Sequence, residues 1–227
     1  MFLIYISGID GCGKTTQSQL LVSFLKDRGI DVQYAWLRWE PSLKRLFSFL
    51  RLLIGKSEQQ KNLSKEDIEN SDHTEWVSFK TNILSRKIIR WLWCNYACAD
   101  YYFASRKPFR KLKSDVVVVD RYVLDFCIDQ ASNLRIKPDD SENLGTNFFL
   151  KRFRLPDLNI IIDLPASEGY SRKLDGTPLD YLKDREKRYR AIRSSEHTLH
   201  VNGLNDIDVV ATKISGHVIK KLRKAVS

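Results

Sequence analysis

The sequence contains few cysteines, and their spacing excludes the sites that clustered cysteines build. The 227 residues include Cys12, Cys94, Cys98 and Cys127, which form no C-x-x-C pair. A structural zinc site needs such pairs or a Cys/His cluster, so no zinc site is expected. Cys94 and Cys98 are four residues apart and would share a helix face, which we interpret as core packing.

The chain also lacks a long hydrophobic run. Its first apolar stretch, residues 2–6, is short and has no basic residue before it, which is typical of neither a signal peptide nor a membrane span. We therefore expect a cytoplasmic protein with no membrane partner. The 10 glycines and 6 prolines are too few for a fibrous chain, and we find no internal repeat. A chain of 227 residues can bury one sizeable core, so we expect a single domain over residues 1–227.

Acidic residues are in the minority. There are 38 Lys and Arg against 28 Asp and Glu, a formal net charge of +10, with basic clusters at residues 106–113, 183–193 and 220–224. Such a surface attracts anions, although most helical Lys and Arg are simply solvated. Without a recognisable binding module this charge does not indicate a nucleic-acid partner. Phosphorylated small molecules would be attracted by the same field.

One motif indicates specific chemistry. Residues 8–15 read Gly-Ile-Asp-Gly-Cys-Gly-Lys-Thr and match the phosphate loop G-x-x-x-x-G-K-[ST]. An apolar run precedes the motif and apolar residues at helical spacing follow it, so the context is strand, turn and helix. In such a loop backbone N–H groups face a polyphosphate, Lys14 reaches the outer phosphates and Thr15 offers a hydroxyl to magnesium. A chance glycine-rich turn would explain neither flanking element.

Cys12 within this loop has two interpretations. It would lie near the N–H groups at a helix start, where a thiolate is favoured, so it could be sensitive to oxidation. The alternative is that it is a small residue that fits the turn.

Five apolar runs predict strands, at residues 2–6, 32–36, 116–119, 158–162 and 198–201. Helical patterns lie between most of them, and this alternation predicts an α/β fold with a parallel five-stranded sheet covered by helices on both faces. Ligands of such sheets bind at the carboxyl ends of the strands. Residues 55–73 and 133–147 are polar and are interpreted as insertions or mobile loops. Residues 76–103 are rich in aromatic residues, which more often form core than a ligand site.

A second carboxylate is needed beside the phosphate loop to hold magnesium. Asp120 ends the run 116–119, and Asp163 ends the run 158–162. Leu164 and Pro165 follow the latter and suggest that Asp163 starts a helix. We therefore favour Asp120 for magnesium, and Arg121 for an acceptor phosphate, because Arg grips phosphate through paired donors.

These segments together resemble the thymidylate kinase family, from the first strand to the last helix. The phosphate loop, extended by Thr16 and Gln17, is similar to the family's loop, and residues 120–122 are similar to its Asp-Arg-Tyr motif. Residues 155–165 are similar to its Pro-Asp-Leu strand, and residues 38–41, Arg-Trp-Glu-Pro, are distantly similar to its Arg-Glu-Pro segment. Each of the last three is weak alone, so it is their order and spacing that carry the resemblance.

The resemblance implies a P-loop nucleotide kinase fold and ATP-dependent phosphorylation of a nucleoside monophosphate, thymidylate by default, with magnesium. It implies that ATP is bound by Gly8, Asp10, Gly11, Cys12, Gly13, Lys14, Thr15 and Thr16, magnesium by Thr15 and Asp120, and the acceptor by Asp10, Arg38, Tyr101, Arg121 and Gln130. Asp10 would contact the acceptor's sugar. Because the acceptor phosphate is already an anion, transfer needs alignment and charge neutralisation rather than a strong base, so no catalytic histidine is expected. Related enzymes are commonly dimers, so a homodimer is compatible with the resemblance.

The resemblance also implies a source of positive charge for the transferring phosphoryl group, beside the catalytic Lys14, Asp10 and Arg121. In the family it comes from the phosphate loop or from a lid in the last third of the chain. Gly11 stands where some members have an arginine, so we expect this chain to depend on a lid around residues 172–180. Arg172 and Lys173 are its candidate cations, and Gly176 and Pro178 would permit a mobile turn. The alternative is that both are solvated cations at a helix end.

The departures from the family lie where base and sugar should bind. The family commonly has an arginine where this chain has Tyr101, and Asp125 and Asp129 replace a small hydroxyl residue and a tyrosine. Two carboxylates near an anionic acceptor would repel it unless they are paired or point at hydroxyls. Two other functions therefore stay open. One is a kinase that acts on a nucleoside or another hydroxyl, with Asp125 or Asp10 as base; the other is a non-catalytic nucleotide-binding module.

Overall fold

The computed structural model describes residues 1–42, 87–134, 136, 148–172 and 176–226. Its centre is a five-stranded sheet in the order β2-β3-β1-β4-β5, in which every neighbouring pair is parallel. The strands are β1 (Phe2–Gly8), β2 (Val32–Trp36), β3 (Val116–Asp120), β4 (Leu158–Asp163) and β5 (Thr198–Asn202). The sequence-based prediction of all five strands is confirmed, and four of them extend one or two residues beyond the predicted apolar runs. The α/β fold class is confirmed as well.

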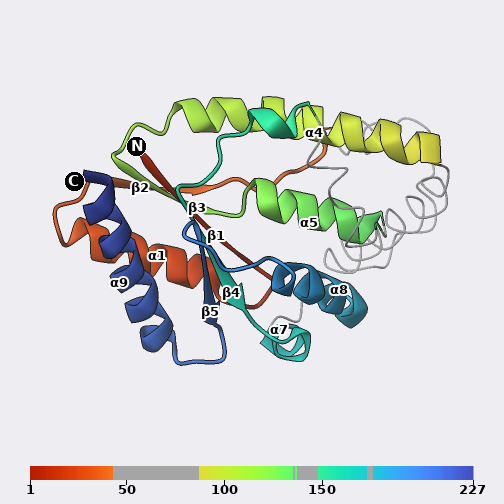
Figure 1. The fold of residues 1–227 in the computed structure, drawn as a ribbon. Helices are drawn as coiled ribbons and strands as arrows, with labels where there is room; N and C mark the ends of the chain where they lie inside the picture. Colours follow the sequence, from red (N-terminus) through yellow and green to blue (C-terminus); the bar gives the residue numbers. More distant parts are fainter. Residues whose placement is uncertain (43–86, 135, 137–147, 173–175, 227) are drawn as a thin grey trace, which may run out of the picture.

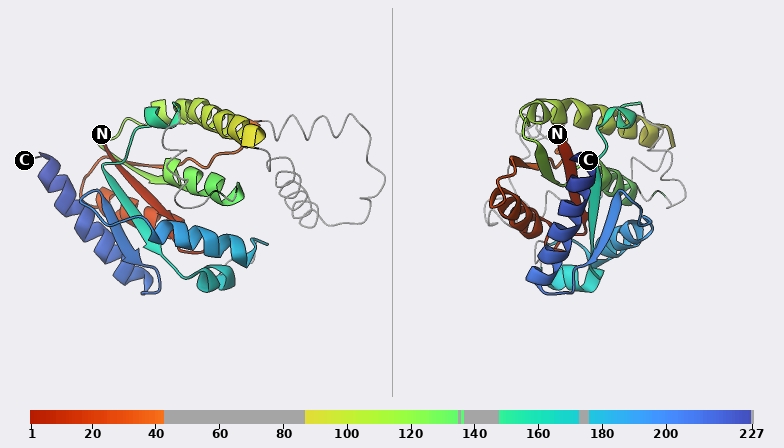
Figure 2. Two further views of the ribbon diagram at one scale, coloured as in Figure 1. Left: turned by 45° about the vertical axis from the view of Figure 1, so that its right-hand side comes forward. Right: turned by 60° about the vertical axis from the view of Figure 1, so that its left-hand side comes forward.

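Helices cover both faces of the sheet, as Figure 1 and the two further views in Figure 2 show. On one side lie α1 (Lys14–Lys26) and α9 (Ile207–Val226), and on the other lie α4 (Lys87–Arg110) and α5 (Val123–Asn133). The short helix η2 (Leu150–Arg152) lies beside α4. Two further helices, α7 (Ala166–Arg172) and α8 (Leu179–Arg190), pack against each other, and α8 also contacts α5. This is the three-layer arrangement that a buried parallel sheet requires.

The alternation of side chains along β1 divides the core in two. Ile4 and Ile6 belong to the cluster that α1 and α9 cover, whereas Leu3 and Tyr5 belong to the cluster that α4 and α5 cover. All four are at most 1% exposed. Successive strand residues point to opposite faces, so a strand buried on both sides is apolar at nearly every position, as β1 is from Phe2 to Ile6.

The sheet brings the ends of three strands to one edge. Ile6 of β1 is paired with Asp120 of β3, and Gly8 is paired with Ile162 of β4. The phosphate loop therefore leaves the central strand between the carboxyl ends of its two neighbours. That is where ligands of open parallel sheets bind.

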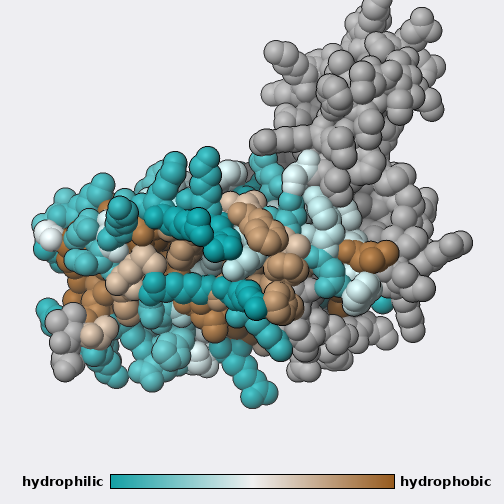
Figure 3. All heavy atoms as spheres, turned by 90° about the horizontal axis from the view of Figure 1, so that it is seen from above, coloured by the Kyte–Doolittle hydropathy of each residue, from teal (hydrophilic) through white to brown (hydrophobic). Residues whose placement is uncertain are grey.

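The described part of the aromatic-rich stretch, residues 87–103, lies in helix α4. Ala97, Cys98 and Tyr101 are at most 2% exposed and form core, as predicted for the cysteine, whereas Trp91 is 64% exposed. Figure 3 views the molecule from the side of α4 and shows hydrophobic side chains between hydrophilic ones. The predicted insertion at 55–73 and most of 133–147 lie outside the described residues. Among the described helices, none is both long enough and apolar enough to cross a membrane.

Candidate active site

The phosphate loop forms the turn that its glycines predict. Gly8, Gly11 and Gly13 have φ angles of 147°, 82° and 91°, a region that residues with a Cβ rarely adopt. Helix α1 begins at Lys14, and within the described chain no side chain caps its first N–H groups. Uncapped N–H groups at a helix start, together with the helix dipole, form an anion-binding site. Thr15 and Thr16 are exposed in the first turn of this helix.

Lys14 lies inside the loop rather than in solvent. Its Nζ donates hydrogen bonds to the carbonyl oxygens of Gly8, at 2.9 Å, and of Ile9, at 2.7 Å. The same Nζ is 4.0 Å from Oδ1 of Asp10, and the residue is 5% exposed. The ammonium group thus lies beside the loop backbone and next to a carboxylate, where it is shielded from water.

Arg121 approaches the same carboxylate from the end of β3. Its Nη2 donates to Oδ1 of Asp10. Among the described residues, Arg121 is the non-glycine residue with a positive φ, 64°. Such a backbone persists at functional sites where the surrounding structure holds it, and here it turns the side chain toward the phosphate loop. The Coulombic effect of Asp10 and Asp125 raises the pKa of Arg121 against the lowering effect of burial. Lys14 and Arg121 therefore converge on one point.

Arg185 of α8 completes this cluster and was not among the site residues predicted from the sequence. Its Nη1 donates to Oδ2 of Asp10 at 2.9 Å, and its Nη2 is 3.0 Å from Oδ1 of Asp129. Burial lowers the pKa of Arg185, but the carboxylates of Asp129 and Asp10 outweigh it and keep the guanidinium charged. Arg185 is 1% exposed although it belongs to a basic cluster. The available signal was its spacing, because it follows the buried Leu182 by three residues on the same helix face.

The two carboxylates that depart from the family pattern are paired. Asp129 forms the ion pair with Arg185, and Asp125 accepts hydrogen bonds from the hydroxyls of Tyr189, at 2.6 Å, and Ser7, at 3.0 Å. Asp125 is 2% exposed. Asp129 therefore meets the condition that the carboxylates be paired, and Asp125 meets the alternative condition that they point at hydroxyls.

The predicted magnesium pair is in contact. The hydroxyl of Thr15 donates to Oδ2 of Asp120 at 2.6 Å, and the Tyr34 hydroxyl donates to the same oxygen at 3.2 Å. Burial, followed by the charge of Asp120, raises the pKa of Tyr34 to about 12, so this phenol stays a donor at neutral pH. The other oxygen, Oδ1 of Asp120, is buried and has no hydrogen-bond partner among the described residues. Oδ2 of the competing Asp163 is 2.8 Å from Nδ1 of His200, and its Oδ1 also has no hydrogen-bond partner among the described residues, but no described contact joins Asp163 to Thr15.

Arg38 and Arg121 line one small pocket, as the prediction that both hold an acceptor phosphate requires. This Arg38–Arg121 pocket is also lined by Trp39, Tyr122, Asp125 and Asp129. Arg38 is exposed, and Arg121 is 8% exposed. Both arginines thus border one pocket, whose walls include the aromatic residues Trp39, Tyr122 and Phe126.

The other two predicted acceptor residues are buried. Tyr101 is 2% exposed, and its hydroxyl donates to the carbonyl of Leu37 at 2.8 Å. Its ring packs on Phe126 at 4.7 Å between centroids. Gln130 is 2% exposed and accepts a hydrogen bond from the Trp93 indole. Neither side chain lines the Arg38–Arg121 pocket, so in this structure both support its walls from behind.

The structure describes only part of the predicted lid. Arg172 ends α7, and its Nη1 donates to the carbonyl of Gly203 at 3.2 Å, so it is not one of the cations around Asp10. Lys173 lies outside the described residues. Helix α7 nevertheless touches the phosphate loop, because a Cβ on Gly11 would lie 2.6 Å from the carbonyl oxygen of Gly169. The loop position that carries an arginine in some related kinases is thus closed by the backbone of α7.

This contact predicts different costs for two matched glycine substitutions. Gly11→Ala and Gly13→Ala both place a Cβ at a positive φ, which costs about 1–2 kcal/mol. Of the two, only the Cβ added at Gly11 would clash with backbone atoms, those of Gly169, whereas a Cβ on Gly13 has no atom within 4 Å. We expect Gly11→Ala to lower the free energy of unfolding by about 1–3 kcal/mol more than Gly13→Ala, as overpacking does. Urea unfolding measures both, and equal losses would show that α7 yields to the added methyl group.

Cys12 is not the activated thiol that one interpretation allowed. It is 4% exposed, and burial raises its pKa although Lys14 opposes the rise. We expect its alkylation by a maleimide at pH 7 to be at least about tenfold slower in the folded than in the unfolded chain, because the thiol stays neutral and covered. The rate should rise with pH. Mass spectrometry of the Cys12 peptide after short pulses measures this rate, and fast labelling of the folded chain would contradict the assignment.

The parallel sheet with a phosphate loop between strand ends, and with cations facing that loop, defines a P-loop nucleotide kinase fold. No protein-family model matches the chain. A protein named probable thymidylate kinase from Pyrococcus horikoshii is 28% identical over 223 residues, which cover 94% of this chain and 93% of that protein. One of the same name from Thermococcus onnurineus is 29% identical over 195 residues, 84% of this chain and 80% of that protein. A thymidylate kinase from Prochlorococcus marinus is 24% identical over 232 residues, covering 97% of each.

Proposed function

We propose that this chain is an ATP-dependent nucleoside monophosphate kinase that converts thymidylate, dTMP, to dTDP. One observation carries the proposal: Lys14 of the phosphate loop and Arg121 of the facing strand end both approach Asp10, and Arg121 also lines a pocket with Arg38. That arrangement supports a donor phosphate site beside an acceptor phosphate site. Similarity to three proteins named thymidylate kinase or probable thymidylate kinase supports the acceptor.

The residues around Thr15 fit a magnesium ion. Magnesium prefers oxygen ligands and is commonly held by one or two side chains together with substrate phosphates. Thr15 and Asp120 supply a hydroxyl and a carboxylate in contact, and Oδ1 of Asp120 is a buried acceptor with no partner among the described residues. Magnesium held there would neutralise charge on the donor phosphates during transfer.

The chain's own groups then align and neutralise the two reactants. The N–H groups of the phosphate loop and Lys14 would hold the ATP phosphates, while Arg38 and Arg121 would hold the phosphate of dTMP. An oxygen of that phosphate attacks the γ-phosphorus of ATP, and the bond to the β–γ bridging oxygen breaks, so that ADP leaves. No base is required, since the attacking oxygen is already anionic. Arg172 or Lys173, as part of a lid, would add positive charge near the transferred group.

The alternative of a hydroxyl acceptor needs a carboxylate that is free to accept a proton. Both oxygens of Asp125 accept hydrogen bonds from hydroxyl groups, and both oxygens of Asp10 accept from arginines. This engagement disfavours either as a general base. The homodimer that the resemblance allows remains part of the proposal without a described interface.

A panel of acceptors tests the proposal. ADP formation from ATP and magnesium is measured with dTMP, other nucleoside monophosphates and thymidine. We expect turnover with dTMP and a loss of about 10²–10³-fold in kcat/KM in Arg121→Ala, the size of removing one group that stabilises the transition state. Arg28→Ala, which removes an exposed arginine in the turn after α1, is the matched control and should leave the rate unchanged. Turnover of thymidine but not of dTMP would establish the hydroxyl-acceptor alternative, and ATP binding without turnover would establish a non-catalytic module.

A further inference from the structure

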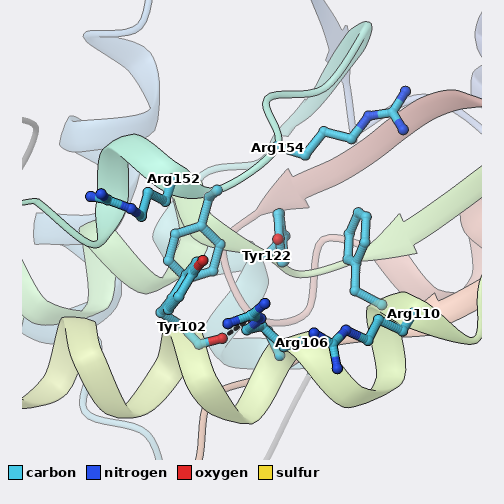
Figure 4. Close-up of a pocket in the computed structure, with 9 residues that line it drawn as sticks. Tyr102, Arg106, Arg110, Tyr122, Arg152 and Arg154 are labelled. Carbon is cyan, nitrogen blue, oxygen red and sulfur yellow. Dashed lines mark hydrogen bonds between the residues drawn. The ribbon is translucent and has the colours of Figure 1, made fainter.

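A second cavity lies away from the phosphate loop and is rich in arginine and aromatic residues. It has a volume of about 230 Å³ and lies between the last turns of α4 and the segment 152–154 that precedes β4 (Figure 4). We propose that this arginine pocket binds a nucleotide, with the base on its aromatic floor and the phosphate at its arginine rim. This site is separate from the two phosphate sites of the proposed kinase reaction.

The floor of the arginine pocket is built from rings. Tyr122 and Phe153 are 4% and 6% exposed, and their ring centroids are 5.4 Å apart in an edge contact. Phe109 stacks on Tyr122 at 5.7 Å, and Tyr102 packs against Phe153 at 5.6 Å. Aromatic side chains offer faces on which a nucleobase can stack, at about 1–3 kcal/mol per base in single-stranded nucleic-acid complexes.

The rim of the arginine pocket carries positive charge that the described protein does not neutralise. Arg106 and Arg110 are exposed and lie one turn apart on α4, so both reach the same side of the pocket. Neither forms an ion pair with any residue in the described part of the chain. Arg106 lies 5.5 Å from the ring of Tyr102, so stacking and charge are available at one point. Arginine forks bind phosphate through paired hydrogen bonds.

Arg152 and Arg154 lie on the opposite side; Arg152 adds to the positive field, whereas Nη2 of Arg154 is 3.8 Å from Oδ2 of Asp157 and its charge is partly balanced. Nη1 of Arg152 donates to the carbonyl of Phe148 at 3.2 Å, and Nη2 of Arg154 donates to the carbonyl of Met1 at 2.6 Å. Figure 4 shows these two guanidinium groups directed outward, so the rim that faces a ligand is that of Arg106 and Arg110. Among the described residues that line the pocket, none carries a carboxylate. A lining of cations without acids selects an anion.

The size and position of the pocket define the ligand further. About 230 Å³ is less than the volume of typical sites for drug-sized ligands, about 300–1,000 Å³, and suits a base with one phosphate at the rim rather than a triphosphate. Tyr122 is the residue that this pocket shares with the Arg38–Arg121 pocket, and the other lining residues differ. The two sites are therefore separate, with one aromatic ring between them.

Calorimetric titration of the full chain with dTMP tests the proposal through stoichiometry. We expect two dTMP sites per chain in the wild type, and one in the double variant Arg106→Glu/Arg110→Glu, because each arginine contributes about 10- to 100-fold to binding of a charged group. Lys107→Glu is the matched control, since Lys107 is exposed on the same helix and does not line the pocket. It should retain both sites. A stoichiometry that is the same in the wild type and in the double variant overturns the proposal.

Two further titrations separate the proposal from its nearest alternatives. Arg38→Ala weakens the proposed acceptor site and should leave the dTMP site that depends on Arg106 and Arg110 intact, so a failure of the kinase proposal cannot be mistaken for a failure of this one. Thymidine and inorganic phosphate should each bind this site at least about 10-fold more weakly than dTMP. Phosphate that binds as tightly as dTMP would show a simple anion site and overturn the nucleotide assignment. If the double variant is misfolded by circular dichroism, Arg106→Gln/Arg110→Gln replaces it.

Discussion

Replacing Lys14 by alanine is expected to lower kcat for phosphoryl transfer from ATP to dTMP by at least about 10²–10³-fold, the effect of removing one preorganised group that stabilises developing charge. Lys14 is buried to 5% exposure inside the phosphate loop, and its Nζ is fixed by two backbone carbonyls. A charge held in place and shielded from water interacts more strongly with phosphate than a solvated one. The loss should therefore appear in kcat and not only in KM.

Lys14 also holds the loop, so the variant needs a structural control. Its ammonium group donates to the carbonyls of Gly8 and Ile9, and alanine leaves both without that donor. Circular dichroism and urea unfolding measure whether the chain remains folded. Lys26→Ala, at the exposed end of the same helix, removes an equal charge far from the loop and should retain wild-type kcat. A Lys14→Ala enzyme that is folded and has nearly wild-type kcat would contradict the assignment of the loop as the donor phosphate site.

The strands and the phosphate loop could be predicted from the sequence because each depends on local pattern. Each of the five predicted apolar runs ends within two residues of the end of an observed strand. Asp120, predicted from the sequence to hold magnesium with Thr15, lies beside Thr15 for the same reason, since it ends an apolar strand next to the strand that leads into the loop. The parallel topology then fixes which strand ends meet. Local pattern plus topology thus positions these residues without knowledge of side-chain packing.

The pairing of charges around Asp10 could not be predicted in this way. Arg185 is 175 residues away from Asp10 in sequence, and its contact depends on how α8 packs against α5 and β4. A basic residue in a cluster of Lys and Arg is usually solvated, so composition indicated the opposite of what is found. Tyr101 illustrates the same limit, because its position in a family motif indicated a ligand contact, whereas helix packing buries its ring. Sequence alone gives the residue types of a site, and tertiary packing decides which of them face a ligand.

The buried cluster has a nearly balanced set of charges, and this explains how the site tolerates three carboxylates. Asp10 and Asp129 are each in contact with Arg185, and Asp10 also contacts Arg121 and approaches Lys14. Asp125 is held by hydroxyl groups instead. Arg185 donates to Oδ2 of Asp10, and Arg121 donates to Oδ1 of the same carboxylate. Arg121 also lines the Arg38–Arg121 pocket, so it contacts Asp10 and the pocket at once. An anion entering that pocket therefore meets an arginine whose position is fixed from behind.

Replacing Arg185 by leucine is expected to lower the free energy of unfolding by about 3–5 kcal/mol, the cost of removing one partner from a buried ion pair. Arg185 is 1% exposed and links Asp10 of the phosphate loop to Asp129 of α5. Its loss therefore removes one positive partner from each of these two carboxylates. For a chain of this size the corresponding fall in Tm is about 6–20 °C. Urea unfolding and scanning calorimetry measure the two quantities.

The matched control for this variant is Arg190→Leu on the same helix. Arg190 pairs with Glu186 at 2.8 Å, but its side chain is 58% exposed, and exposed pairs contribute about 0–1 kcal/mol. Adding Asp129→Asn to Arg185→Leu should restore part of the lost stability, because the double variant removes one of the unpaired charges, with a coupling of about 0.5–3 kcal/mol. Equal, small losses in Arg185→Leu and Arg190→Leu would show that water reaches Asp10 and Asp129, in which case Arg121 is not held from behind and the preorganised acceptor site loses its support.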